Sequence, residues 1–360
     1  MNIMKRILIW VVCLLVLGIS PAVKAIKPSK VEVREVASEK KVEVLVDGKL
    51  FTAYIYPENI KKPVLWPVVT PEGNMVTRSF PLVVKAGERA DHPHHVGIWL
   101  NYGNVNGLDF WNNSEAIPVE KAGGYGAILH RSVDKIRNGR RDASLTVGAD
   151  WVDSNGKKLL DEKSAFRFLA NPKLRIIDRT TTLTAVEGNV SFADNKEGMF
   201  AIRVTSELEL PAKGALELTD AHGNVTRVEK PDQSKVSGNY LSSEGITGAD
   251  VWGTRGKWMQ LSGRMNGEEV SVVIIDHPSN PGYPTYWHAR GYGLFAANPL
   301  GQKALSGGKE ELNFVLSKGK SVTFRYRLVV YSGKMTPSDI QKLTNSYICC
   351  RKSKLFNREW

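Results

Sequence analysis

The stretch SVTFRYRLVVY, residues 321–331, decides the fold of this protein. Its large apolar side chains occupy every second position, which is the spacing of a β-strand with one buried and one wetter face. The buried positions are Val322, Phe324, Tyr326 and Leu328, and the wetter positions are Ser321, Thr323, Arg325 and Arg327. The pattern predicts a strand of a half-covered sheet.

Outward from this stretch, strand patterns dominate the chain. KVEVLVDGKLFTAYIY, residues 41–56, reads as two strands around Asp47-Gly48, a pair that tight hairpin turns prefer. FAIRVTSELEL, residues 200–210, alternates like the first stretch, with Ile202, Val204 and Leu208 opposite Arg203, Thr205 and Glu207. VSVVIIDHP, residues 270–278, is continuously apolar before its polar end, as expected of a strand covered on both faces.

Helix signals are concentrated in TPSDIQKLTNSY, residues 336–347, where Thr336 can cap a helix and Pro337 suits its first turn. These patterns predict an all-β fold, a large antiparallel β-sandwich with one C-terminal helix. We expect a single sandwich domain over residues 26–335, followed by the helix and a basic tail over residues 336–360. Two smaller sandwiches, divided near residues 150 to 170, are the alternative.

The first 25 residues indicate export. Lys5 and Arg6 precede an apolar run over residues 7–19, and AVKA ends at Ala25, as in a secretory signal peptide. Removing this segment deletes Lys5, Arg6 and Lys24 and no acid, so the formal net charge falls from +12 to +9. We therefore expect a periplasmic or extracellular protein without a membrane span, and no nucleic-acid partner. Only Cys349 and Cys350 remain, and neighbouring cysteines cannot staple a core.

Histidines gather in two segments that both contain Asp-His-Pro. The first holds His92, His94 and His95 within four positions, and the second, residues 274–301, holds Asp276, His277 and His288. Three interpretations stay open for them. They could chelate a metal, they could perform acid–base catalysis near neutral pH, or they could hydrogen-bond turns at strand ends. We expect the two segments to meet at one end of the sandwich.

Aromatic and polar residues accompany both segments. Tryptophan faces beside hydrogen-bonding side chains are typical of sugar sites, although the same tryptophans could simply belong to the core. Lys196-Glu197 next to a strand makes Glu197 a candidate base, and a solvated ion pair is the alternative. The expected substrate-binding residues are Arg203, Asn106, Trp99, Trp111, Trp287 and Arg290.

Four motifs in order resemble one known family. They are DHPHHVGIWLNYGNVNGLDFW (91–111), NKEGMFAIRV (195–204), VWGTRGKWMQLSG (251–263) and DHPSNPGYPTYWHARGYGLFAANPLG (276–301). Together they resemble the exported bacterial family of unknown function labelled "methane oxygenase PmoA", over about residues 30 to 335. The resemblance implies a supersandwich fold akin to that of galactose mutarotase and a genomic setting among sugar-degrading genes. Members more often read His-His-Arg-Gly where this chain has His95-Val96-Gly97.

We expect a carbohydrate-active protein, leaning towards an enzyme that acts on a sugar or glycoside as an epimerase, lyase or hydrolase. The expected catalytic set is His92, His94, His95, Glu197, Asp276, His277 and His288, with one histidine as general acid and a carboxylate as base. Non-catalytic glycan binding is the alternative. No metal is assigned, because no glutamate follows His92-x-His94 and Pro93 restricts how His92 can turn. A divalent transition metal stays open as a cofactor.

Overall fold

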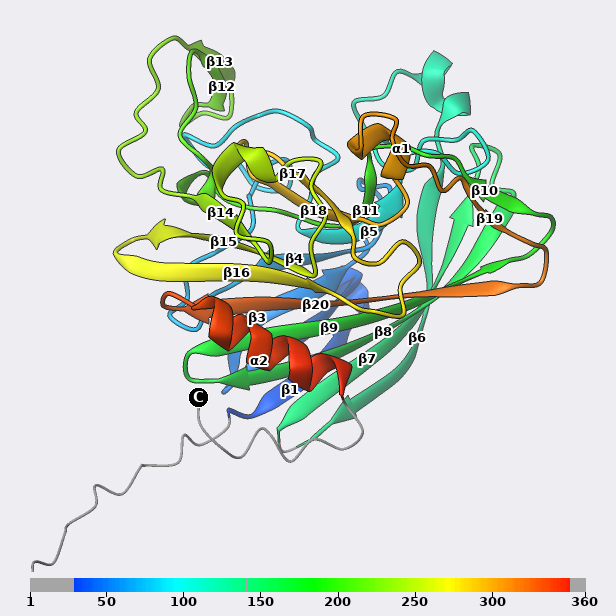
Figure 1. Ribbon diagram of the computed structural model, residues 1–360, viewed down its shortest axis with the longest axis horizontal. Coiled ribbons are helices and arrows are strands. Elements are labelled where there is room, and N and C mark those ends of the chain that lie inside the picture. The colour runs from blue at the N-terminus through cyan, green and yellow to red at the C-terminus, as the bar shows by residue number, and fades with distance from the viewer. Residues whose placement is uncertain (1–28, 140, 350–360) are drawn as a thin grey trace, which may run out of the picture.

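The computed structural model describes residues 29–139 and 141–349, and two eight-stranded antiparallel sheets account for most of this part (Figure 1). The first sheet has the order β1-β2-β3-β4-β5-β11-β18-β17. Its strands are β1 (Val31–Val36), β2 (Lys41–Val46), β3 (Lys49–Ile55), β4 (Val64–Val68), β5 (Ile98–Tyr102), β11 (Gly198–Arg203), β18 (Leu294–Asn298) and β17 (Tyr286–Ala289).

The second sheet has the order β14-β15-β16-β20-β9-β8-β7-β6. Its strands are β14 (Asn239–Ser242), β15 (Trp258–Met265), β16 (Glu268–Asp276), β20 (Ser321–Ser332), β9 (Leu174–Ala185), β8 (Lys158–Asn171), β7 (Asp142–Val152) and β6 (Ala127–Asn138). Two short antiparallel ribbons accompany the sheets, β10 (Val190–Phe192) with β19 (Phe314–Leu316), and β12 (Leu216–Thr219) with β13 (Val225–Val228).

Helices are few in the described chain, in keeping with the all-β prediction, which the structure confirms. The α-helices are α1 (Gln302–Leu305) and α2 (Pro337–Ile348), and the 3₁₀ helices are η1 (Ala37–Glu39), η2 (Val119–Gly124), η3 (Ser206–Leu208) and η4 (Gly248–Val251). Among the described residues, no helix has the length and apolar character needed to cross a membrane.

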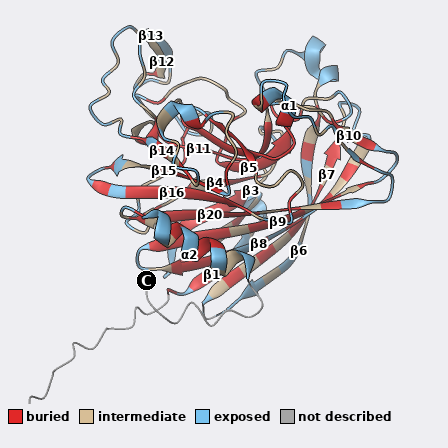
Figure 2. Ribbon diagram, viewed as in Figure 1, coloured by how far each residue is buried: buried red, intermediate tan, exposed pale blue. Residues whose placement is uncertain are grey.

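The main hydrophobic core lies between the two sheets. Side chains from both sheets form one cluster, in which the rings of Phe200 on β11 and Tyr326 on β20 stack with centroids 4.9 Å apart. Figure 2 shows most strands of the two sheets buried over much of their length, whereas the residues of β6 are mainly half-buried or exposed. The residues of η2 are exposed, and most of those of the β12–β13 ribbon are exposed or half-buried. We call the face of each sheet that meets this core the inner face, and the opposite face the outer face.

The strand expected over residues 321–331 is β20, and its apolar positions are buried as predicted. Its other face is not uniformly wet, because α2 packs on the outer face of the second sheet (Figure 1). Arg327, expected on the wetter face, is only 2% exposed and forms an ion pair with Asp178, Nε to Oδ1 at 2.6 Å. The same helix covers Val273 and Ile275 of β16, which confirms the doubly covered strand expected over residues 270–278.

Two local predictions are confirmed in detail. Asp47 and Gly48 join β2 to β3 with φ values of 50° and 81°, the left-handed conformation that a tight hairpin requires. Helix α2 begins after Thr336, whose side chain accepts a hydrogen bond from the Asp339 backbone N–H in a capping box.

One expectation about faces is wrong. Arg203 and Thr205 were expected to be wetter than Ile202 and Val204, but both are completely buried. Arg203 ends β11, which lies inside the first sheet between β5 and β18 and is covered on both faces. Thr205 follows this strand, and its backbone N–H donates to the Val76 carbonyl. The proposed signal peptide and Cys350 with the rest of the basic tail lie outside the described residues. Cys349 is exposed and forms no disulfide with another described residue.

Candidate functional site

The histidine-rich loop before β5 is organised by Arg78. Its guanidinium donates hydrogen bonds to the backbone carbonyl oxygens of Asp91 at 2.7 Å, His92 at 2.8 Å and His95 at 3.2 Å. Arg78 is 1% exposed, so these bonds are made in a nearly dry environment. One buried side chain therefore fixes the turn that presents the three histidines.

Asp91 links this loop to β11. Its Oδ1 accepts hydrogen bonds from Arg78 at 2.7 Å and from Arg203 at 2.6 Å, and its Oδ2 lies 3.3 Å from His92 Nδ1. Burial alone would raise the pKa of Asp91, but His92 and the two guanidinium groups outweigh it and lower the pKa well below its usual range. Asp91 therefore stays ionised and locks the loop to the sheet.

Four nearly parallel aromatic rings form offset stacked pairs on the outer face of the first sheet, and we call them the aromatic stack. Tyr292 and His92 are parallel with centroids 5.0 Å apart, His92 and His95 follow at 4.9 Å, and His95 and Trp99 at 5.3 Å. Arg203 lies over the Tyr292 ring at 4.9 Å. The stack joins the two histidine-containing segments, since Tyr292 comes from the second.

The tautomer of His95 follows from its partner. Arg203 can only donate, so its contact of 3.2 Å with His95 Nδ1 leaves the hydrogen of the neutral ring on Nε2. The ring stays neutral because burial, together with the nearby cations, holds the pKa of His95 well below its ordinary value. In the part of the chain that the structure describes, His95 Nε2 has no hydrogen-bond partner.

Two indole N–H groups beside His95 also lack a hydrogen-bond acceptor within the described part of the chain. Trp99 and Trp111 are fully buried, their ring centroids lie 5.2 Å apart, and neither Nε1 meets a hydrogen-bond acceptor among the described residues. The ring of His95 contacts both. Three buried N–H donors thus gather at one place without acceptors.

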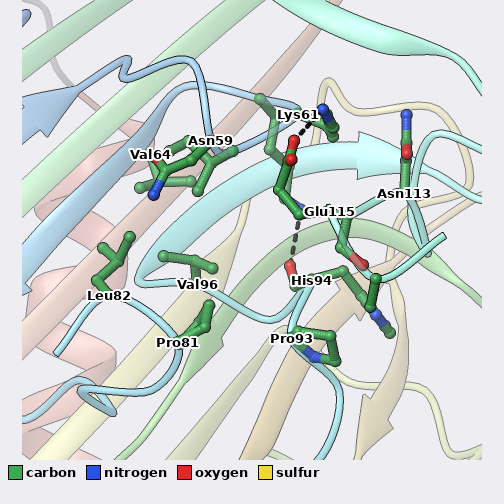
Figure 3. Close-up of a pocket in the computed structure, with 14 residues that line it drawn as sticks. Asn59, Lys61, Val64, Pro81, Leu82, Pro93, His94, Val96, Asn113 and Glu115 are labelled. Carbon is green, nitrogen blue, oxygen red and sulfur yellow. Dashed lines mark hydrogen bonds and ion pairs between the residues drawn. The ribbon is translucent and has the colours of Figure 1, made fainter. Parts of the chain in front are cut away.

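His94 borders a pocket of about 170 Å³ beside this cluster (Figure 3). Its ring contacts that of His95 at 4.3 Å, and its backbone carbonyl accepts a hydrogen bond of 2.7 Å from Lys62 Nζ. Burial, followed by the positive charges of Lys62, His92, Arg78 and Arg203, lowers the pKa of His94 to about 2. His94 is consequently a neutral ring at any ordinary pH.

Strand register places His288 on the same outer face. His288 on β17 pairs with Ala296 on β18, which pairs with Ala201 on β11, which pairs with Trp99 on β5. Residues directly opposite in antiparallel strands point to the same face, so the row runs from a histidine across two alanines to a tryptophan. The next row of that face contains Leu294 and Arg203.

His288 is held in one tautomer. Its Nδ1 lies 2.7 Å from the backbone carbonyl oxygen of Lys196, and because a carbonyl only accepts, Nδ1 carries the hydrogen. Burial lowers the pKa of His288, while the charge of Glu197 acts in the opposite direction. A neutral His288 therefore has Nε2 as its hydrogen-bond acceptor.

Glu197 lies at the start of β11, close to His288 and Tyr292, on whose pKa values its charge acts. Its side chain is 15% exposed and its Oε1 is 2.5 Å from Lys196 Nζ. Gly103 permits this placement, because a Cβ there would lie 2.7 Å from the Glu197 Cβ. Arg290 is exposed and lies over the rings of Trp252 and Tyr292.

Four of the expected site residues lie elsewhere. Asp276 ends β16 in the second sheet, completely buried, and accepts hydrogen bonds from the backbone of His277 and Thr285 and from Asn280. His277 contacts Tyr347 of α2. Trp287 points into the core between the sheets, and Asn106 bonds to the backbone near β10. The two Asp-His-Pro triplets are therefore apart, although their segments meet through Tyr292.

The sequence reasoning overlooked Arg78, Lys62 and Tyr292. Tyr292 lies within the motif over residues 276–301 and could have been predicted as an aromatic neighbour of His288. Arg78 and Lys62 are single cations with no motif around them in the sequence, and only their burial in the structure distinguishes them.

No group of three or more His, Cys, Asp or Glu side chains within residues 29–139 and 141–349 is arranged to hold a metal ion.

The comparison with protein families identifies a relationship over most of the chain. A model described as "Family of unknown function (DUF6807)" matches residues 41–345. The chain belongs to the DUF6807 family. The matched range contains the aromatic stack, the buried N–H donors and His288. No curated protein sequence matches the chain.

Solved structures of similar fold are distant. The galactosidase domain of the α-galactosidase–sucrose kinase AgaSK has a TM-score of 0.42 and 10% identity, covering 84% of this chain and 42% of its own. This DUF6807 chain thus spans less than half of that protein.

Two further similarities cover whole proteins. For a putative aldose 1-epimerase from Escherichia coli K12, the TM-score is 0.32 at 9% identity, over 85% of this chain and 100% of that one. For galactose 1-epimerase from Lactobacillus acidophilus NCFM, the TM-score is 0.36 at 9% identity, over 86% and 100%. Likenesses this distant carry no argument about activity, which must come from the site itself.

Proposed function

We propose that this chain is an exported, periplasmic or extracellular carbohydrate-active enzyme that acts on a sugar or glycoside by acid–base chemistry on the outer face of the first sheet. The observation that carries the proposal is the group of buried N–H donors without acceptors on His95, Trp99 and Trp111. Leaving such a donor unsatisfied costs about 1–3 kcal/mol. The donor atoms are closed to solvent in the structure, so a sugar must displace the side chains that cover them. Its hydroxyl oxygens would then accept from these donors while the aromatic faces pack against ring C–H groups.

The proposed chemistry centres on His288. Its Nδ1 is occupied by the Lys196 carbonyl, so Nε2 is the atom that takes a proton from the substrate and later returns it. The charge of Glu197 favours the imidazolium that forms in between. In this assignment His288 is first a base, and Glu197 stabilises charge. Epimerisation, elimination and hydrolysis all use such a proton transfer. The resemblance to the PmoA-labelled family also stays a prediction.

The test compares His288→Gln with His277→Gln as the matched control, because His277 lies beside α2. We expect His288→Gln to lower turnover of a sugar found in a substrate screen by about 100-fold or more, with sugar binding retained. His277→Gln should behave as the unchanged protein does. Full turnover in His288→Gln would refute the role of this residue.

The second candidate function is glycan binding without catalysis, in which the aromatic rings and the buried N–H donors bind the sugar and His288 takes no part. Trp111→Phe keeps the ring and removes one of the buried N–H donors. Weaker sugar binding in this variant, in a protein that turns over none of the sugars it binds, would favour this second function over the first.

A further inference from the structure

The pocket beside His94 contains a buried cation without a matching carboxylate. We call it the Lys62 pocket and define it by Lys62, Val64, Pro93, His94, Asn113 and Glu115 (Figure 3). Lys62 is 4% exposed, and its ammonium makes a single hydrogen bond, to the His94 carbonyl. An ammonium has three donors, so two of them make no hydrogen bond among the described residues. The ammonium also lies over the Trp99 ring, 5.5 Å from its centroid. Within the described residues Lys62 has no ion pair, which is unusual for a buried charge.

The other charged groups around Lys62 are already engaged. Glu115, at the rim, pairs with Lys61. The carboxylate that acts on Lys62 is Asp109, whose oxygens accept from the backbone N–H groups of Trp111 and Asn112 and from the Asn112 side chain. Both nearby acids therefore have other partners.

The charges that act most strongly on His94, at the edge of the pocket, are positive. After burial, the largest effects on the pKa of His94 come from Lys62, His92, Arg78 and Arg203, and all of them oppose a further positive charge. His94 and His95 are neutral here and contribute none. A pocket of about 170 Å³ with this charge suits a small oxyanion group.

We propose that the Lys62 pocket binds the oxyanion group of an acidic sugar, either a carboxylate or a sulfate ester, with Lys62 Nζ as its principal donor. This inference rests on the proposed function, because the His94 ring joins the pocket to the histidine and tryptophan cluster. The sugar ring then lies against that cluster, and its acidic substituent enters the pocket. The substrate class is thereby narrowed to uronic acids or sulfated sugars.

Ligand binding is coupled to the protonation of Lys62. Burial lowers the pKa of Lys62 from its ordinary value of 10.5 to about 7, against a smaller opposing effect of Asp109. A bound anion favours the ammonium form and raises this pKa again. Binding should therefore take up about half a proton at pH 7 and nearly one at pH 8.

The experiment is calorimetric titration with three sugars that share one ring, namely glucuronate, glucose 6-sulfate and glucose. Each titration is run at pH 7 and pH 8 in two buffers of different ionisation enthalpy, so that proton uptake is measured directly. Lys62→Met is compared with Lys163→Met, a control on β8 whose side chain is 66% exposed. We expect Lys62→Met to weaken binding of the acidic sugars by about tenfold to hundredfold and to abolish proton uptake.

The outcomes separate this inference from the proposed function. If glucose binds as tightly as the acidic sugars, or if Lys62→Met binds them unchanged, the inference is wrong and the sugar site stands. If the acidic sugars bind through Lys62 but His288→Gln keeps full turnover, the inference stands and the catalytic role falls. The tighter of glucuronate and glucose 6-sulfate identifies the group. Proton uptake in the unchanged protein decides the matter even if Lys62→Met fails to fold, since no uptake overturns the proposal.

Discussion

Replacing Lys62 by methionine should stabilise the protein at neutral pH, in the absence of bound anions. The folded state holds the pKa of Lys62 at about 7, whereas the unfolded chain restores about 10.5. At about 1.4 kcal/mol per pH unit, this fall amounts to at most about 5 kcal/mol of lost stability. Methionine removes that penalty and keeps an unbranched side chain that is one atom shorter. It gives up one hydrogen bond worth about 1 kcal/mol and the contact of the ammonium with the Trp99 ring. A net gain of about 2–4 kcal/mol follows.

The sign of the pH dependence is fixed by the direction of the pKa shift. Between pH 7 and 10.5 the unfolded chain holds the Lys62 proton more tightly than the folded protein does, so stability rises with pH across this window. Below pH 7 the penalty is fully present. The advantage of Lys62→Met should therefore be largest at pH 6 and should vanish towards pH 10.

The assay is urea unfolding of the unchanged protein, Lys62→Met and Lys163→Met at pH 6, 8 and 10, in buffers free of carboxylates and sulfate. Lys163→Met controls for the loss of one positive charge, since Lys163 is exposed. A difference between Lys62→Met and the unchanged protein that is equal at all three pH values would refute the reasoning. Destabilisation by Lys62→Met at pH 6 would refute it equally.

Two further predictions concern the helix on the second sheet. Arg327→Met leaves Asp178 without its partner beneath α2 and should lower the free energy of unfolding by about 3–5 kcal/mol. Arg325→Met, at a half-buried position, should lower it much less. Equal losses for the two variants in urea unfolding would contradict this prediction. Thr336→Ala removes the N-cap of α2 and should lower the free energy of unfolding by about 1 kcal/mol. Thr336→Ser keeps the hydroxyl and should leave it unchanged. An unchanged melting curve for Thr336→Ala would show that the cap does not stabilise the protein.

Part of the site could be predicted from the sequence, because the histidines cluster in two segments of the chain. His92, His94, His95, Glu197 and His288 do lie on one face of one sheet. Their roles stay predictions. The segment that contributes His288 also contains Asp276 and His277, which lie twelve and eleven residues earlier. Asp276 ends a strand of the other sheet, and His277 follows it and contacts Tyr347 of α2. Proximity in sequence therefore did not give proximity in space.

What the sequence by itself determined is the local conformation. Alternation at Val322, Phe324 and Tyr326, the Asp47-Gly48 turn and the Thr336 cap each depend on residues within a few positions of one another. Such patterns are enough for strands, turns and a helix, and hence for an all-β fold.

Only the tertiary structure decided which strands are neighbours. The order β5-β11-β18-β17 joins segments about a hundred residues apart and aligns Trp99, Ala201, Ala296 and His288 in one row. It also placed Lys62 against His94 and covered Arg327 with α2. Burial and charge depend on these distant contacts, and with them the pKa of Lys62 and the tautomers of His95 and His288. No local pattern contains that information, because a strand's periodicity specifies its faces and not its partners.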